Sequence, residues 1–331
     1  MKNYLTTDGN KFPTYFKYIS DNQEVIDGIF LKNKIRFTQP AALNDPLESI
    51  PQIDFGPKSS NLNQRFIYKE VVIPSYKDWA RAQVIERFYN EFGILSLTKQ
   101  PLNYTMWNYY SNGHKGVVLE LKEDFLQLPC FLSLSRPPLE IIEVQYVKDY
   151  KVDFEDYVNG FNNFSFDDFI QKIIAIKTNH WEYEKEYRVV RSLAESENYK
   201  PRTQRTSFRD RSSLYLFDFS LDCINSVVFG VNTEQLLKKK VMDACRDHEI
   251  AFIQAVIVQD NGVNMSFENI AKFGSEDVFL NHLPQVFITD AQELSLPPKK
   301  NINSLNEIPF YSSFKNSIDE FLENRRRRLS K

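Results

Sequence analysis

Two glutamates separated by one residue are the strongest chemical signal in the sequence. Glu184 and Glu186 lie in the segment Trp181–Val190, where charged and apolar residues alternate. Alternation with a period of two predicts a β-strand whose charged face carries both glutamates and Arg188. If that face lines a cleft, the carboxylates can accept hydrogen bonds, act as general bases or stabilise a developing positive charge. A solvated outer strand face would explain the same pattern without chemistry, because like charges about 7 Å apart repel only weakly in water.

A second polar strand face offers hydroxyl groups. In Gly93–Thr98, alternation places Ser96 and Thr98 on one face and leucines on the other. The hydroxyls could orient a ribose or an amide, or they could be the solvent side of an ordinary strand. We expect both residues to share a concave pocket with the glutamate pair and with Lys17, because a common cleft is the simplest reason for two polar faces in one sheet.

An aromatic segment and the turn after it provide candidate ligand contacts. Trp107 lies in the expected helix 104–110 and could stack on a base or a nicotinamide ring, although core packing explains it equally. His114 lies in a Gly-His-Lys-Gly turn, where we expect its ring to be accessible to solvent.

An acidic turn early in the chain adds three more candidates. Asn44 and Asp45 precede Pro46 in a turn signature, and Glu48 follows closely. Their side chains could point back into the cleft, or they could serve the turn alone. No Walker loop, GxSxG elbow, GxGxxG turn or metal-ligand spacing occurs, so no metal site is predicted.

Composition favours a folded protein that stays in the cytoplasm. The 331 residues are 42% hydrophobic with a formal net charge of -3, which predicts a packed core and gives no reason for capture of nucleic acid by overall charge. The sequence shows no secretory signal, and its longest apolar stretch, Ile250–Val258, is far shorter than the roughly 20 residues of a membrane helix. We expect a cytoplasmic protein without membrane contact. Cys130, Cys223 and Cys245 are expected to be reduced, buried thiols.

Hydrophobic periodicity predicts the helices and strands that must position these residues. Expected strands cover residues 16–18, 34–38, 93–98, 116–121, 141–147, 181–190, 225–230 and 251–258. Expected helices cover residues 21–32, capped by Asp21, and residues 65–92, 104–110, 167–179 and 234–247. Because hairpin-length and helical connections are mixed, we predict an α+β fold with a mixed, mostly antiparallel central sheet and flanking helices.

We expect one large domain over residues 1–298, because no Pro/Gly/Ser-rich linker divides it. Residues 299–331 are a polar segment with an amphipathic C-terminal helix that ends in Arg325–Arg328. A basic last turn complements the helix dipole, and contact with nucleic acid or a partner is the alternative.

Together these segments resemble the bacterial family designated domain of unknown function 2971 (DUF2971). The order and spacing of the motifs carry the resemblance over about residues 14–260. The family usually has an arginine after Lys-Tyr near the N-terminus, and this chain has Ile19 there. The matching segments are Phe16-Lys17-Tyr18, Leu43-Asn44-Asp45-Pro46-Leu47-Glu48, Gly93–Thr98, Met106-Trp107, His114-Lys115-Gly116 and Trp181–Arg188.

A second resemblance is to ADP-ribosyltransferases, which carry an early basic residue, a Ser-x-Ser-like strand and a late Glu-x-Glu strand. The corresponding positions here are Lys17, Ser96-Leu97-Thr98 and Glu184-Lys185-Glu186, with Lys17 where arginine or histidine is usual. The resemblance implies an ADP-ribosyltransferase-like fold and transfer from NAD, as substrate, to an unidentified protein or nucleic acid. By analogy it also implies a role in anti-phage defence.

This second resemblance implies a role for each candidate. Glu186 would hydrogen-bond the nicotinamide-side ribose and stabilise an oxocarbenium ion, while Glu184 would orient or deprotonate the acceptor. Glu186→Gln would then abolish activity with little loss of stability. Contacts to NAD would come from Lys17, Tyr18, Ser96, Thr98, Trp107 and His114.

Two other classes of function compete with this one. Glu120-Leu121-Lys122 at the end of a strand, with Asp45 upstream, resembles the acidic and basic residues of metal-dependent nucleases. The third hypothesis is a module without catalysis that binds protein or nucleic acid through its aromatic surface and Arg325–Arg328.

Overall fold

The computed structural model describes residues 14–45, 48, 52–54, 66–68, 71–73, 85–86, 88–132, 139–149, 151–153, 166–199, 211–259, 263–269 and 286–288. The chain divides into two compact units, residues 1–287 and 288–331. The C-terminal helix expected from the sequence, with Arg325–Arg328, lies outside the described residues.

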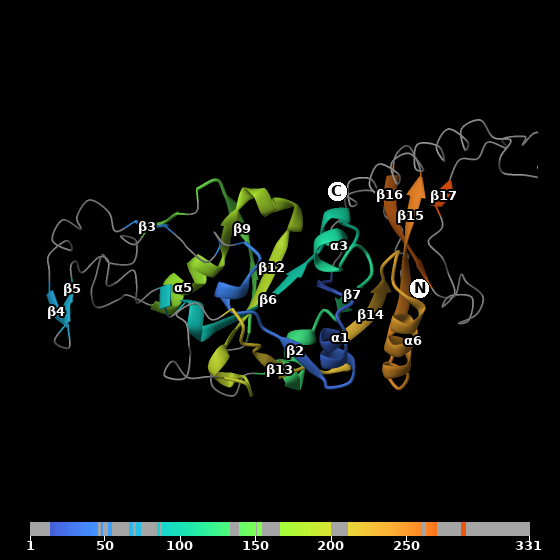
Figure 1. Cartoon of the computed structure of the whole chain (residues 1–331), viewed down its shortest axis with the longest axis horizontal. Helices are drawn as coiled ribbons and strands as arrows, with labels where there is room; N and C mark the ends of the chain where they lie inside the picture. Colours follow the sequence, from blue (N-terminus) through green and yellow to red (C-terminus); the bar gives the residue numbers. More distant parts are fainter. Residues whose placement is uncertain are drawn as a thin grey trace, which may run out of the picture. The chain divides into compact units, whose positions relative to one another are not determined.

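A large mixed sheet forms the centre of the first unit (Figure 1). From β16 (Val263–Asn269) across to β8 (Ile141–Glu143), neighbouring strands pair antiparallel, except that β14 (Ile224–Phe229) and β15 (Ala251–Gln259) run parallel. The prediction of an α+β fold with a mostly antiparallel sheet is therefore confirmed. In spatial order the strands are β16 (Val263–Asn269), β15 (Ala251–Gln259), β14 (Ile224–Phe229), β7 (Val117–Leu121), β1 (Phe16–Ile19), β6 (Phe92–Thr98), β12 (Glu186–Ser192) and β8 (Ile141–Glu143), and β17 (Val286–Ile288) pairs with β15.

Four pairs of short strands accompany the large sheet in the described part of the chain. Two pairs are parallel: β3 (Gln52–Asp54) with β10 (Lys151–Asp153), and β9 (Gln145–Val147) with β11 (Ile176–Thr178). Two are antiparallel: β2 (Lys34–Arg36) with β13 (Leu216–Asp218), and β4 (Phe66–Tyr68) with β5 (Val71–Ile73).

The helices follow the apolar spacing of the sequence. In the described part of the chain they include α1 (Gln23–Phe30), α3 (Tyr104–Tyr110), α5 (Phe166–Ile174) and α6 (Gln235–Ala244). In α1, Ile26, Ile29 and Phe30 are buried at helical spacing. The cap is Asn22, whose side chain accepts from two backbone N–H groups, and the prediction of Asp21 as the cap was wrong by one residue. An ion pair joins α1 to α6, which lie side by side in Figure 1.

The register of three neighbouring strands positions the candidate site. In β1, Phe16 pairs with Thr98 of β6, and in β12, Glu186 pairs with the same Thr98. Arg188 pairs with Ser96 on the same strands. The early basic segment, the hydroxyl strand and the glutamate strand are therefore adjacent, although they are far apart in the sequence.

The predicted strand over residues 181–190 was wrong in its first half. The segment Asn179–Glu184 is a 3₁₀-helix, and Lys185 then has a left-handed backbone with a φ of 43°. Glu182 and Lys185 form an exposed ion pair across this turn. Their (i, i+3) spacing fits a 3₁₀-helix, but the alternating charges of the sequence fit a strand equally well. The strand proper begins at Glu186.

Three other element predictions also need correction. The helix expected over residues 167–179 ends at Ile174, because the β-branched residues after it form strand β11 against β9. The strand expected over 141–147 is divided at Val144 into β8 and β9. Within the helix expected over 65–92, the described residues 66–68 and 71–73 form the pair β4 and β5, whereas residues 85, 86 and 88–91 are helical as expected.

Candidate functional site

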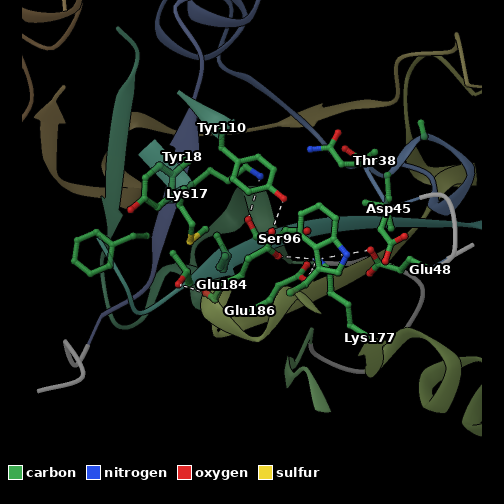
Figure 2. Close-up of a pocket in the computed structure, with 18 of the residues that line it drawn as sticks. Lys17, Tyr18, Thr38, Asp45, Glu48, Ser96, Tyr110, Lys177, Glu184 and Glu186 are labelled. Atoms are coloured by element: carbon green, nitrogen blue, oxygen red, sulfur yellow. Dashed lines mark hydrogen bonds and ion pairs between the residues drawn. The ribbon is translucent and has the colours of Figure 1, made fainter. Parts of the chain in front are cut away.

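A pocket of about 220 Å³ opens where β1, β6 and the start of β12 meet. Figure 2 shows its charged side chains converging on one space. As expected, the glutamate pair, Lys17, Ser96 and Thr98 all line it. Nine of the residues predicted from the sequence do so: Lys17, Tyr18, Asn44, Asp45, Glu48, Ser96, Thr98, Glu184 and Glu186.

The two glutamates share a lysine that the sequence did not indicate. Lys177 Nζ lies 2.7 Å from Glu184 Oε2 and 2.9 Å from Glu186 Oε2, and all three side chains are buried. Burial alone would lower the pKa of Lys177, but the two carboxylates outweigh it and raise that pKa, so the lysine stays charged. Lys177 comes from β11, directly after α5, within an otherwise apolar run of sequence.

Glu186 is held in place by Arg188 from the same strand face. Arg188 Nε and Nη2 each lie 2.9 Å from an oxygen of Glu186, and Nη1 donates to the Ile174 carbonyl at 2.6 Å. Arg188 also forms an ion pair with Glu48, and Lys177 Nζ lies 3.7 Å from Glu48. Arg188 is buried and is not among the residues that line the pocket, so its contribution is to fix Glu186.

Glu184 has a different environment from Glu186. Its Oε1 accepts a hydrogen bond from the Tyr110 hydroxyl of α3 (Figure 2). Burial raises the pKa of Glu184, and Lys177 only partly opposes this effect. A buried carboxylate with a raised pKa, next to a pocket, is suited to exchanging a proton with a bound molecule.

The turn before β12 explains how both glutamates reach the pocket. Thr98 Oγ1 donates to the Glu184 carbonyl at 2.6 Å and accepts from Gln100 N. Lys185, between the two glutamates, has a left-handed backbone, and Glu186 N donates to the Tyr146 hydroxyl at 2.7 Å. The Thr98 hydroxyl therefore holds the glutamate turn, in addition to lining the pocket.

Two further cations, Lys17 and Arg36, line the pocket. Lys17 Nζ donates to the Ser96 carbonyl at 3.0 Å, and Arg36 reaches Gln39 Oε1 only at 3.4 Å. Neither forms an ion pair within the part of the chain that the structure describes, and Arg36 Nε is buried without a hydrogen-bond partner there. Burial lowers the pKa of Lys17 to about 8, which leaves it mostly charged at neutral pH. Ile19, at the position where the DUF2971 resemblance led us to expect arginine, is buried in the core.

Two predicted contact residues lie outside the pocket. Trp107 is fully buried and its indole N–H donates to the Pro101 carbonyl at 2.7 Å. The expectation that His114 is accessible was wrong, because only 6% of it is exposed and its ring stacks on Trp107 with centroids 6.0 Å apart. Its backbone is left-handed, with a φ of 66°. Tyr18 lines the pocket, but its hydroxyl donates to the Gln100 carbonyl at 2.8 Å.

The nuclease constellation is not assembled. Glu120 is buried in β7, where it accepts hydrogen bonds from Thr14 at 2.9 Å and Ser226 at 2.6 Å. It is not among the residues that line the pocket, whereas Asp45 is. The described residues contain no group of three or more His, Cys, Asp or Glu side chains arranged to hold a metal ion.

Comparison with known proteins finds one stretch of the chain that matches a family model. Residues 106–189 match the family model described as "Protein of unknown function (DUF2971)", which confirms that resemblance. The matched stretch contains Tyr110, Lys177 and both glutamates, while Lys17 and Arg36 lie before it. Neither the curated proteins nor the solved structures include a significant match to this chain. In the described residues, no helix has the length and apolar character that crossing a membrane requires.

Proposed function

We propose that the chain is an NAD-dependent glycosyl-transfer enzyme of the ADP-ribosyltransferase kind, with the charged pocket as its active site. The observation that carries this proposal is the mixed charge of the pocket lining. Glu184 and Glu186 are both paired with Lys177, Asp45 and Glu48 line the same pocket, and Lys17 and Arg36 line it without an ion-pair partner among the described residues.

The chemistry of this lining fits the nicotinamide end of NAD. Lys17 and Arg36 are suited to the diphosphate, because cations that lack protein counter-ions gain most from a bound anion. The rings of Tyr110 and Trp181 line the pocket and provide faces for a flat heterocycle. A carboxylate fixed at two points, as Glu186 is by Arg188, is suited to accept hydrogen bonds from ribose hydroxyls.

The size of the pocket limits how much of NAD it encloses. A drug-sized ligand usually fills about 300–1,000 Å³, and this cavity of about 220 Å³ is smaller. We infer that it takes the nicotinamide and its ribose, with the adenosine end extending outward.

The two glutamates would have separate tasks in the reaction. The bond between ribose C1′ and the nicotinamide nitrogen breaks, and its electron pair neutralises the pyridinium ring. Glu186 stabilises the positive charge that develops on the ribose. Glu184, with its raised pKa, accepts the proton of the acceptor nucleophile as that nucleophile bonds to C1′.

The test is nicotinamide release and label transfer from ³²P-NAD incubated with the purified protein and a cell extract. We expect release by the wild type and a loss of at least about a hundredfold in Glu184→Gln, the usual order for a general base. Glu182→Gln is the matched control, because Glu182 is two residues away and its side chain is 58% exposed. Absence of both NAD binding and nicotinamide release in the wild type would overturn the proposal.

A defence role is a further part of this proposal, motivated by the ADP-ribosyltransferase resemblance. A cytoplasmic enzyme would have direct access to NAD. Phage plating on cells that express the wild type should fall relative to cells that express Glu184→Gln. Equal plating would remove the defence role without affecting the proposed chemistry.

A further inference from the structure

Two cysteines far apart in the sequence are in contact outside the pocket. Cys130 belongs to a 3₁₀-helix, Pro129–Phe131, and Cys223 ends another, Leu221–Cys223, just before β14. Their sulfur atoms are 3.3 Å apart. Cys130 is a partly exposed residue and Cys223 is fully buried, so the pair is open to solvent only from the Cys130 side.

The packing around the pair holds the sulfurs together. Phe131, next to Cys130, makes edge-to-face ring contacts with Phe125 and Phe219, at centroid distances of 5.1 and 6.3 Å. Cys223 N donates to the Ser220 carbonyl at 3.0 Å. Closing the gap from 3.3 Å to a bond of about 2 Å therefore requires a movement of little more than an ångström.

The surroundings make the two thiols chemically unequal. A hydrogen bond from Cys223 lowers the pKa of Cys130 to about 7, and the nearby Arg191 guanidinium acts in the same direction. The same contact raises the pKa of Cys223. Arg191 is held at this place because its Nη1 donates to the Cys130 carbonyl at 3.0 Å. Cys130 is thus placed to react as a thiolate, with Cys223 as the thiol behind it.

We propose that Cys130 and Cys223 form a redox modification site, at which a peroxide converts the adjacent thiols into a disulfide. The Cys130 thiolate attacks one peroxide oxygen, the O–O bond breaks, and the protonated leaving oxygen departs as water or an alcohol. Cys130 is then a sulfenic acid. Cys223 attacks its sulfur, the S–S bond forms, and the hydroxyl leaves as water with the Cys223 proton. The two sulfurs are oxidised and the peroxide is reduced.

The test exposes the reduced full-length protein to hydrogen peroxide near neutral pH, alkylates the remaining thiols and maps the peptides by mass spectrometry. We expect an intramolecular link between the Cys130 and Cys223 peptides, with a mass lower by two hydrogens, while Cys245 is alkylated. Cys245 is an internal control, since it is buried with a pKa raised to about 12. Raising the pH through about 7 should speed the reaction.

Two variants distinguish the roles of the sulfurs. Cys223→Ser should stop at a sulfenic acid on Cys130 that dimedone traps, and Cys130→Ser should leave Cys223 unoxidised. The disulfide is also detected in the wild-type protein, so that result does not depend on whether a variant folds. Full alkylation of both cysteines after peroxide, or links only between molecules, would overturn the proposal.

Discussion

Glu186 and Arg188 form a two-point ion pair on one face of β12, with both hydrogen bonds at 2.9 Å and both side chains buried. The sequence alone suggests a charged strand face, but in the structure these two charged side chains are paired and buried in the interior. Removing Glu186 would leave the buried Arg188 with only Glu48 as an ion-pair partner among the described residues, and so with less compensation for its charge.

Glu186→Gln should therefore destabilise the protein by about 3 kcal/mol, in contrast to the small effect expected from the sequence. The amide keeps the shape but removes the charge that Arg188 and Lys177 share. Urea unfolding followed by circular dichroism measures the change. Glu182→Gln, on the exposed turn, should change stability by less than about 0.5 kcal/mol. Equal stability of the two variants would show that Glu186 is not a structural partner.

His114 should make the fold sensitive to acid. Burial lowers the pKa of this histidine, so below its ordinary value of about 6.5 the unfolded chain takes up a proton that the folded state does not. The buried His114 therefore lowers the free energy of unfolding as the pH falls through about 6.5 and below. His114→Phe should remove this contribution and gain about 1 kcal/mol, because neither ring nitrogen has a hydrogen-bond partner among the described residues. Urea midpoints at about pH 7 and pH 5 test this, and an unchanged pH slope in the variant would count against it.

Deprotonation of Lys17 should weaken anion binding at alkaline pH. Its pKa of about 8 means that the charge is present at neutral pH and is lost as the pH rises through that value. NAD affinity, measured by calorimetry, should then fall between about pH 7 and pH 9, by an amount on the order of tenfold. Lys17→Arg should keep its affinity across this range, since a guanidinium remains protonated. The same decline in the arginine variant would assign the titration to another group.

The sequence predicted which residues line the pocket better than it predicted the secondary structure that carries them. Strand alternation brought Ser96, Thr98 and Glu186 together correctly, because β6 and β12 are regular strands in register. The prediction that Glu184 lines the pocket was correct, but its predicted secondary structure was wrong. Glu184 ends a 3₁₀-helix, and the left-handed residue Lys185 follows it. A turn of this kind has almost no signal in a single sequence.

The residues that were missed come from tertiary contacts. Lys177 and Arg36 belong to short strands whose partners are distant in the chain, so their placement depends on packing that periodicity does not report. A lysine between buried isoleucine and threonine was the available sign for Lys177, since such a charge needs a partner. Conversely, Trp107 and His114 were assigned to the ligand because nothing in the sequence shows whether a ring on a helix or in a turn faces the core.

The most direct test of the central claim is a crystal structure of the protein with a non-hydrolysable NAD analogue. We expect electron density in the pocket, with the diphosphate beside Lys17 and Arg36 and the nicotinamide-side ribose beside Glu186. Density for the analogue at a different place, or a pocket that excludes it at saturating concentration, would contradict the proposed NAD site.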